Sequence, residues 1–199
     1  MELKILKIFV PGEYGSGTSS ICRRFSENKF IIKRTSRIGI DFVRKVIHYK
    51  ENQFTIQLWE QAHNERFNTI SRMYYKYSKG FLLVFTPTER SSIEYIKNES
   101  EYIMSNAKTK NNVKYLIESK SDLCEKREVS KEEAIALSKE YGYKYFECSA
   151  LTGENVHEII HCIMRDIIER ELLDNDKKLL DNDKKYLTNK DRNKKCIIF

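Results

Sequence analysis

A glycine-rich turn at Lys4–Ser20 constrains this chain more than any other stretch. The apolar run Ile5–Val10 has the composition of a strand, Pro11-Gly12 ends it, and the following loop leads into a helix start at Ile21–Phe25. A strand, a glycine-rich loop and a helix start in this order can hold a phosphate. The loop turns its backbone amides inward, and the helix N-terminus adds partial positive charge.

The loop matches most of the phosphate-loop pattern Gly-x-x-x-x-Gly-Lys-Ser/Thr. Gly12 and Gly17 stand at the two glycine positions, and Ser19 stands at the position whose hydroxyl binds a metal ion. Thr18 replaces the lysine that reaches the phosphates. The other residues of the loop that we expect to contact a nucleotide are Gly15, Ser16 and Ser20.

Length and composition limit the class of protein. The 199 residues suffice for one compact domain with a tail, and the formal charge of +7 is spread over mixed charges of both signs. Such mixing is typical of a solvated surface, so we expect no nucleic-acid partner. Five widely spaced cysteines, an odd number, indicate reduced thiols in a cytosolic protein. The N-terminus shows no signal peptide, and no apolar run is long enough to span a bilayer.

Strands and helices alternate along the chain, which predicts an α/β fold with a largely parallel sheet and ligands at the carboxyl ends of its strands. Residues 40–49 and 53–59 predict an antiparallel hairpin, and the later buried strands fall at 81–85, 113–118 and 145–148. Helices are predicted at 65–77, 91–106, 130–141, where Ser130 and Glu133 have capping-box spacing, and 155–173.

From residue 172 the sequence changes character. The segment Leu172–Lys178 repeats identically as residues 179–185, which allows either a flexible linker, the interpretation we favour, or a weak extension of the preceding helix. We therefore divide the chain into a folded domain at 1–171 and a charged tail at 172–199. The tail ends in Cys196-Ile197-Ile198-Phe199, a Cys-a-a-X signal whose final Phe favours geranylgeranylation of Cys196. The basic residues before it would supply a second attraction to anionic membranes.

Taken in order, the motifs make the chain resemble a small GTPase of the Ras superfamily, most closely the Rab branch, over about residues 3–170. Ile38–Phe42 matches the segment that follows the first switch, and the second switch is matched by Trp59, Ala62 and Glu65–Phe67. Lys120-Ser121-Asp122-Leu123 resembles the guanine-recognition motif, and Cys148-Ser149-Ala150 the loop behind the base. The resemblance implies a P-loop small-GTPase fold, with a mostly parallel six-stranded sheet flanked by about five helices.

The family's ligands are GTP or GDP with Mg²⁺, and the resemblance carries its roles to matching positions. Asp122 would accept hydrogen bonds from the guanine edge and Lys120 would cover the ring, while Ser119 replaces the motif's asparagine. Ser19 and Glu60, the latter in place of an aspartate, would hold the metal. The remaining residues expected at the base are Leu123, Ser149, Ala150 and Leu151, the last in place of a lysine.

Departures from the family concentrate around the phosphates. Besides Thr18, Arg37 replaces the first-switch threonine, His63 replaces the glycine that meets the γ-phosphate, and Asn64 replaces the water-orienting glutamine. Asn64 is one methylene shorter than glutamine, so as the degenerate catalytic residue it should orient water poorly. We expect weakened GTP binding and very slow or absent hydrolysis. Arg37 is the candidate to replace the missing lysine charge.

Two weaker patterns have simpler explanations. His157-Glu158-Ile159-Ile160-His161 matches a zinc-peptidase pattern, but the resemblance places it on the family's last helix, away from any cleft. Tyr74, Tyr75 and Tyr77 form either an effector patch or part of the packing around the second-switch helix.

Two functions follow from the resemblance. One is a prenylated Rab-like switch in vesicle traffic, with impaired hydrolysis, on the cytoplasmic face of intracellular membranes and with a cytosolic pool, that meets Rab-type effectors through its switch regions. The other is a pseudo-GTPase that serves as a membrane-tethered scaffold without cycling. The retained Lys120 and Asp122 favour the first, and Thr18, Arg37 and His63 favour the second.

Overall fold

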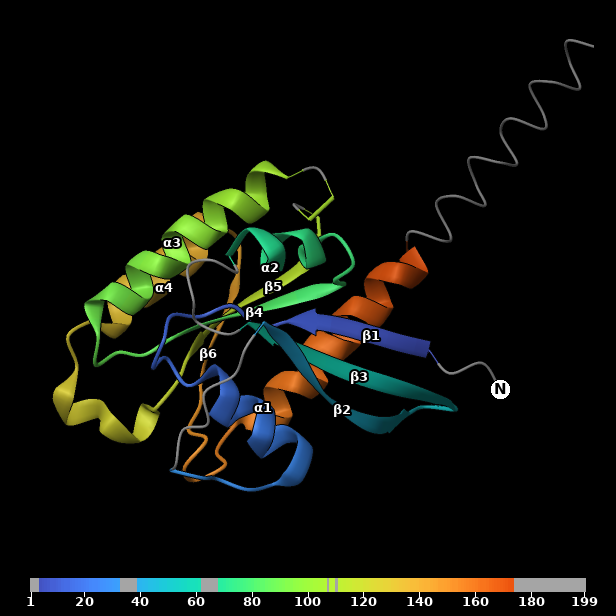
Figure 1. Cartoon of the computed structure of the whole chain (residues 1–199), viewed down its shortest axis with the longest axis horizontal. Coiled ribbons are helices and arrows are strands. Elements are labelled where there is room, and N and C mark those ends of the chain that lie inside the picture. The colour runs from blue at the N-terminus through green and yellow to red at the C-terminus, as the bar shows by residue number, and fades with distance from the viewer. Residues whose placement is uncertain (1–3, 33–38, 62–67, 107, 110, 174–199) are drawn as a thin grey trace, which may run out of the picture.

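The computed structural model describes residues 4–32, 39–61, 68–106, 108–109 and 111–173, without the side chains of residues 68–71 and 124. The described residues form a central sheet with helices on both faces (Figure 1). This arrangement confirms the predicted α/β class.

Six strands form one sheet in the order β2-β3-β1-β4-β5-β6. Only the β2–β3 pair is antiparallel, and the pairs β1–β3, β1–β4, β4–β5 and β5–β6 are parallel. The predicted mostly parallel six-stranded sheet is therefore confirmed. The strands are β1 Lys4–Phe9, β2 Ile40–Tyr49, β3 Asn52–Gln61, β4 Gly80–Phe85, β5 Val113–Glu118 and β6 Lys144–Glu147.

The helices divide between the two faces of the sheet, and each face has its own core. One core joins β1 and β3 to α1 and to a helix at residues 156–173, through side chains such as Phe25, Ile56 and Ile160. The other joins β4 and β5 to α2, α3 and α4, through side chains such as Tyr75, Phe81 and Ile96. The labelled helices are α1 Thr18–Glu27, α2 Asn68–Tyr75, α3 Arg90–Ser105 and α4 Lys131–Glu140.

Local sequence explains where α4 begins. Ser130 caps α4, because its hydroxyl accepts a hydrogen bond from the amide of Glu133 at 3.1 Å. The predicted strand at 145–148 lies one residue earlier, and β3 extends past the predicted end to Gln61. The sequence did not predict η2, a 3₁₀ segment at Ser121–Lys126.

The carboxyl ends of the parallel strands lie at one end of the sheet, where the connecting loops gather (Figure 1). The start of β1 and the end of the 156–173 helix lie at the other end. None of the helices in the described part of the chain is long and apolar enough to span a bilayer.

Candidate nucleotide-binding site

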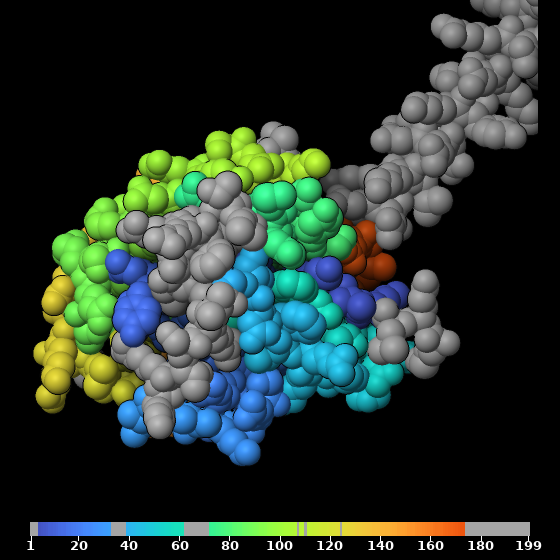
Figure 2. All heavy atoms as spheres, viewed as in Figure 1, coloured from blue at the N-terminus to red at the C-terminus, as the bar shows by residue number. Residues whose placement is uncertain are grey.

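The phosphate loop joins β1 to α1 and keeps the backbone shape of a phosphate cradle. Gly15 and Gly17 have φ of 89° and 99°, a conformation that side-chain-bearing residues rarely adopt. Helix α1 starts directly at Thr18, so its first amides point into the loop. Figure 2 shows the blue atoms of this segment at the surface beside the first turns of α3, drawn in green.

The loop is wound tightly around Gly12. A Cβ added at Gly12 would lie 2.5 Å from Ser16 Oγ, 2.6 Å from the Val84 carbonyl and 2.7 Å from Thr18 Cγ2. The same segment is bound to β4, because the Val84 amide donates to the Pro11 carbonyl at 2.8 Å. The packing of the loop therefore requires glycine at position 12, and no larger side chain fits there.

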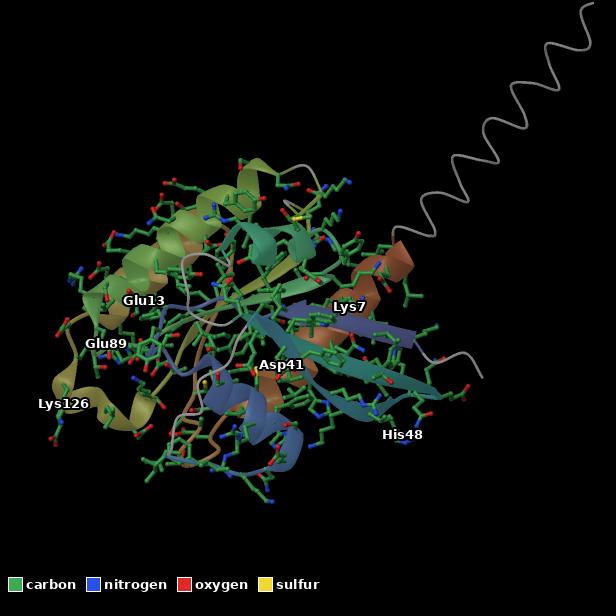
Figure 3. The ribbon with its side chains drawn as sticks, viewed as in Figure 1. Lys7, Glu13, Asp41, His48, Glu89 and Lys126 are labelled. Carbon is green, nitrogen blue, oxygen red and sulfur yellow. The ribbon has the colours of Figure 1, made fainter. Side chains whose placement is uncertain are left out.

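Thr18, the residue in place of the lysine, is packed beneath the loop. Its side chain is 3% exposed and its methyl lies against Gly12. Residues 12–20 contain no lysine or arginine and one acid, Glu13. Glu13 accepts a hydrogen bond from Ser91 Oγ at 2.7 Å, and Figure 3 places Glu13 and Glu89 at the same end of the molecule, near the start of α3. The loop thus offers backbone amides but no side-chain cation to a phosphate.

Ser119 connects the phosphate loop to the base-recognition loop. Its hydroxyl is within hydrogen-bond distance of the Ser16 carbonyl and lies 2.9 Å from the Phe85 carbonyl, and its side chain is 2% exposed. A Cβ on Gly17 would lie 3.3 Å from Ser119 Oγ. The serine that replaces the family's asparagine therefore still holds the two loops together.

The base-recognition loop begins with Lys120 in a left-handed conformation, at φ 55°. The Ser121 amide donates to the Cys148 carbonyl at 3.1 Å, and Ser149 Oγ donates to the Asp122 carboxylate. Asp122 is exposed. This contact fixes the rotamer of Asp122 and leaves its carboxylate able to accept further hydrogen bonds, as guanine recognition requires.

Arg24, on α1, holds the loop behind the base. Its Nε donates to the Ala150 carbonyl at 2.8 Å, and its Nη2 donates to the Leu151 carbonyl at 2.8 Å. The Leu151 side chain itself is 52% exposed. Burial raises the pKa of the neighbouring Cys148 thiol to about 12, so this thiol stays protonated in neutral solution. Sequence reasoning missed Arg24, because the motif patterns contain no residue of this part of α1.

Of the two residues expected to hold the metal, Ser19 lies half-buried in the first turn of α1 and Glu60 lies at the end of β3. Glu60 is 1% exposed, and its position pairs with Asp41 in the β2–β3 ladder. Oxygen donors of this kind suit Mg²⁺. Arg37, Ala62, His63 and Asn64 lie outside the described residues.

The second-switch segment is attached to α3 at both of its ends. The Gln61 side-chain amide donates to Tyr95 Oη at 2.6 Å. At α2, Arg72 Nη2 donates to Glu99 Oε1 at 2.9 Å, and Tyr75 Oη donates to Glu99 Oε2 at 2.8 Å. Burial, followed by the charge of Glu99, raises the pKa of Tyr75 well above its ordinary value, so this hydroxyl remains a donor.

An aromatic surface lies between β2, β3 and α2. The rings of Phe42 and Trp59 stack at 4.7 Å, and those of Trp59 and Tyr74 at 5.8 Å. A cavity of about 180 Å³ adjoins this surface, lined by Lys7, Phe9, Trp59, Tyr74, Tyr77 and Ser78. The tyrosine cluster therefore divides: Tyr75 is core, whereas Tyr74 and Tyr77 are 40% and 58% exposed.

Comparison with known proteins agrees with this geometry. The model of the Ras family matches residues 7–169. The chain belongs to the Ras family. It is 38% identical over 175 residues to the Ras-related protein RAB1BV of Beta vulgaris, covering 87% of this chain and 80% of that one. It is 35% identical over 164 residues to the Ras-related protein Rab-13 of Canis lupus familiaris, covering 82% and 80% of the two chains.

A third relative, the Ras-related protein Rab-27B of Homo sapiens, is 32% identical over 176 residues, covering 83% of this chain and 81% of that one. The chain is thus a Rab-like member of the superfamily, as its motifs predicted. Family members bind guanine nucleotide with Mg²⁺. The oriented Asp122, the wound Gly12 loop and the oxygens of Ser19 and Glu60 fit that ligand, whereas buried Thr18 supplies no charge to it.

The zinc-peptidase pattern falls on the 156–173 helix. The His157 ring lies 5.8 Å from the ring of Phe25, and burial, together with nearby Lys45, lowers the His157 pKa. Across the described ranges, no three His, Cys, Asp or Glu side chains are grouped so as to hold a metal ion. Within the pattern, His157 thus packs against α1, whereas His161 is exposed.

Proposed function

We propose that this protein is a Rab-like GTP-binding protein of intracellular vesicle trafficking, with weakened GTP binding and impaired hydrolysis. One observation carries the proposal. Ser149 and Arg24 organise the base end of the site, while Thr18 is buried beneath a phosphate loop that has no cation. The protein would bind the guanine base through retained contacts and bind the phosphates of the nucleotide weakly.

The expected loss of GTP affinity follows from the missing phosphate-loop lysine. A charge-assisted hydrogen bond contributes about 1.5–3 kcal/mol, which is roughly a ten- to hundredfold loss of affinity. Backbone amides and the α1 N-terminus would still attract phosphate. Titration with fluorescent GDP and GTP, with and without Mg²⁺, tests this proposal. Binding weaker than that of a lysine-bearing relative is expected, and no binding of either nucleotide would refute it.

Impaired hydrolysis rests on the residues around the reacting phosphate. Asn64 is too short to orient water as glutamine does, and the buried Glu60 is one methylene longer than aspartate. Ser19 and Glu60 would hold Mg²⁺, which supplies charge neutralisation at the phosphates when bound. Single-turnover release of phosphate tests this point, and a rate equal to that of an ordinary Rab would refute it.

Arg37 is our candidate for a replacement cation, because the resemblance places it in the first switch, close to where the γ-phosphate would be. If it reaches the γ-phosphate, Arg37→Ala weakens GTP binding more than GDP binding. Equal effects on the two nucleotides would remove this role.

Effector binding would use the Phe42–Trp59–Tyr74 aromatic surface, whose rings are partly exposed beside the second-switch helix. The protein would reach the cytoplasmic face of intracellular membranes through geranylgeranyl on Cys196 and the basic tail, and it would keep a cytosolic pool. Cys196→Ser should move the protein from the membrane pellet to the supernatant of fractionated cells. Unchanged pelleting would contradict lipid anchoring.

The second candidate is a pseudo-GTPase that acts as a membrane-tethered scaffold. The Gln61–Tyr95 and Arg72–Glu99 contacts support it, because side chains of the protein itself attach the residues on either side of the second switch to α3. A scaffold would bind its partner equally with and without nucleotide. A partner that prefers the GTP-loaded protein would exclude this function.

A further inference from the structure

We propose that Glu118 is a positioning residue for guanine recognition: its buried carboxylate pairs with Arg127, closes the 119–126 loop at both ends and thereby fixes Asp122. This inference rests on the proposed function, in which Asp122 reads the guanine edge. Glu118 itself lies beneath the loop and belongs to none of the motifs that the sequence revealed.

The two residues flank the loop directly. Glu118 is the last residue of β5, and Arg127 is the C-cap of η2. Glu118 is 0% exposed, Arg127 Nη1 donates to Glu118 Oε2 at 2.9 Å, and Arg127 Nη2 donates to Glu118 Oε1. A bidentate pair fixes the orientation of both partners as well as their distance. The pair therefore joins the start of the loop to its end.

Further contacts fasten this pair to its surroundings. Tyr145 Oη on β6 donates to Glu118 Oε2 at 2.7 Å, and Arg127 Nη1 also donates to the Val129 carbonyl at 3.0 Å. The amides of Glu128 and Val129 donate to the Pro87 carbonyl at 2.7 and 3.1 Å. Burial, and then the hydrogen bond to Glu118, raises the pKa of Tyr145, so its hydroxyl stays a donor. The far end of the loop is thus held to the β4–α3 connection.

The loop needs such closure because its own structure is weak. It is a short 3₁₀ segment, interrupted at Leu123, where φ is −105° and ψ is 35°. Asp122 and Leu123 are exposed and cannot be held by core packing. Within the loop, the Ser121 amide donates to the Cys148 carbonyl, while Glu118 and Arg127 hold the two ends.

Glu99 offers a matched control for Glu118, because it is a second buried carboxylate with the same kinds of partner. This carboxylate is 3% exposed and also receives one arginine and one tyrosine hydroxyl, from Arg72 at 2.9 Å and Tyr75 at 2.8 Å. It joins α2 to α3, away from the base-recognition loop. Comparing Glu118→Gln with Glu99→Gln therefore separates a general loss of stability from a loss of guanine positioning.

The first measurement compares GDP with inosine diphosphate, which lacks the 2-amino group that Asp122 would bind. The preference for GDP should fall about tenfold in Glu118→Gln, the value of one charge-assisted hydrogen bond, and stay within about twofold in Glu99→Gln. Tyr145→Phe should lower the preference by a smaller factor and Tyr75→Phe should leave it unchanged. An unchanged preference in Glu118→Gln would overturn the proposal.

The second measurement needs no nucleotide. Hydrogen–deuterium exchange at amides 119–126 of the full chain should be faster in Glu118→Gln and unchanged in Glu99→Gln. If the wild type binds neither nucleotide, the proposed function fails, whereas this exchange still decides the positioning role. If Glu118→Gln does not fold, Tyr145→Phe decides by the same exchange. Exchange equal to wild type at these amides would refute the inference.

Discussion

The base end and the phosphate end of the site are built by different means. At the base end, side chains hold backbone: Arg24 binds the carbonyls of Ala150 and Leu151, and Ser149 orients Asp122. At the phosphate end the loop is wound tightly around Gly12 and Ser119 Oγ holds the Ser16 carbonyl, while Thr18 is buried in place of an exposed cation.

The difference teaches that the fold of a phosphate loop and its charge are separable. The conformation of the loop depends on close packing around Gly12 and on the Pro11–Val84 hydrogen bond, and neither needs a positive charge at position 18. Phosphate affinity, by contrast, depends on the lysine that the family has at this position. A chain can therefore lose the charge and keep the cradle, and the experiments below test each half in turn.

The largest effect is expected from Asp122→Ala. Loss of two charge-assisted hydrogen bonds to guanine should weaken GDP binding by roughly a hundredfold or more. Since Asp122 is exposed, the free energy of unfolding should change by less than about 1 kcal/mol. Titration measures the GDP affinity, and urea denaturation measures the free energy of unfolding. A GDP affinity equal to wild type would show that Asp122 does not bind guanine.

Gly12→Ala tests whether the phosphate loop is as tightly wound as the structure shows. Its Cβ would lie 2.6 Å from the Val84 carbonyl, a backbone atom that cannot move cheaply. We expect a loss of about 3 kcal/mol in the free energy of unfolding. Gly142→Ala is the control, because a Cβ there meets nothing within 4 Å and only the φ of 69° is strained. Equal losses in the two variants would mean that the loop is loose.

Thr18→Lys should partly restore the phosphate end. The added ammonium should raise GDP affinity by roughly tenfold and leave guanosine affinity unchanged. Thr18→Met supplies a long side chain without the charge and should give no increase. If Thr18→Lys also gives none, the phosphate end has lost more than its lysine.

The smallest predicted effect is a pH dependence of stability that comes from Lys114, far from both the base end and the phosphate end of the site. This residue lines a groove of about 470 Å³ with Tyr143 and Arg170, and burial, followed by the charge of Arg170, lowers the pKa of Lys114 to about 8. Between pH 8 and its ordinary value of 10.5 the unfolded chain binds more protons than the folded one, so this residue makes stability rise with pH.

The rise should be on the order of 1 kcal/mol between about pH 8 and 10, before tyrosine ionisation intervenes. Denaturation curves of Lys114→Met should lack this contribution. Guanosine and GDP affinities of the variant should match wild type, because the groove is separate from the loops that form the site. A change in either affinity would connect this groove to the site.

Sequence patterns predicted the strands well because a continuously buried strand leaves a plain apolar run, as in β4 and β5. Motif spacing, which is local, also singled out Gly12, Gly17 and Asp122, and the roles of these residues toward a nucleotide stay predictions. The 3₁₀ segment η2 was missed, since its short, irregular turn has no hydrophobic period.

The supporting contacts could not be predicted, because they join residues far apart in the chain. Arg24 contacts residues 150 and 151, and Ser119 contacts Ser16, so only the folded sheet brings these partners together. Glu118 and Arg127 are closer in sequence, but an acid and a base on either side of a motif are common on surfaces. Burial of the pair, which sequence does not reveal, is what makes it informative.

The most direct test is the affinity series from guanosine through GMP and GDP to GTP, measured on the wild type by calorimetry with Mg²⁺ present. If the base end is kept and the phosphate end eroded, guanosine binds measurably and each added phosphate improves affinity far less than it does in a Ras-family protein that carries the phosphate-loop lysine. A series as steep as that of such a lysine-bearing protein, or guanosine that fails to bind while GTP binds tightly, would contradict the division of the site into a retained base end and an eroded phosphate end.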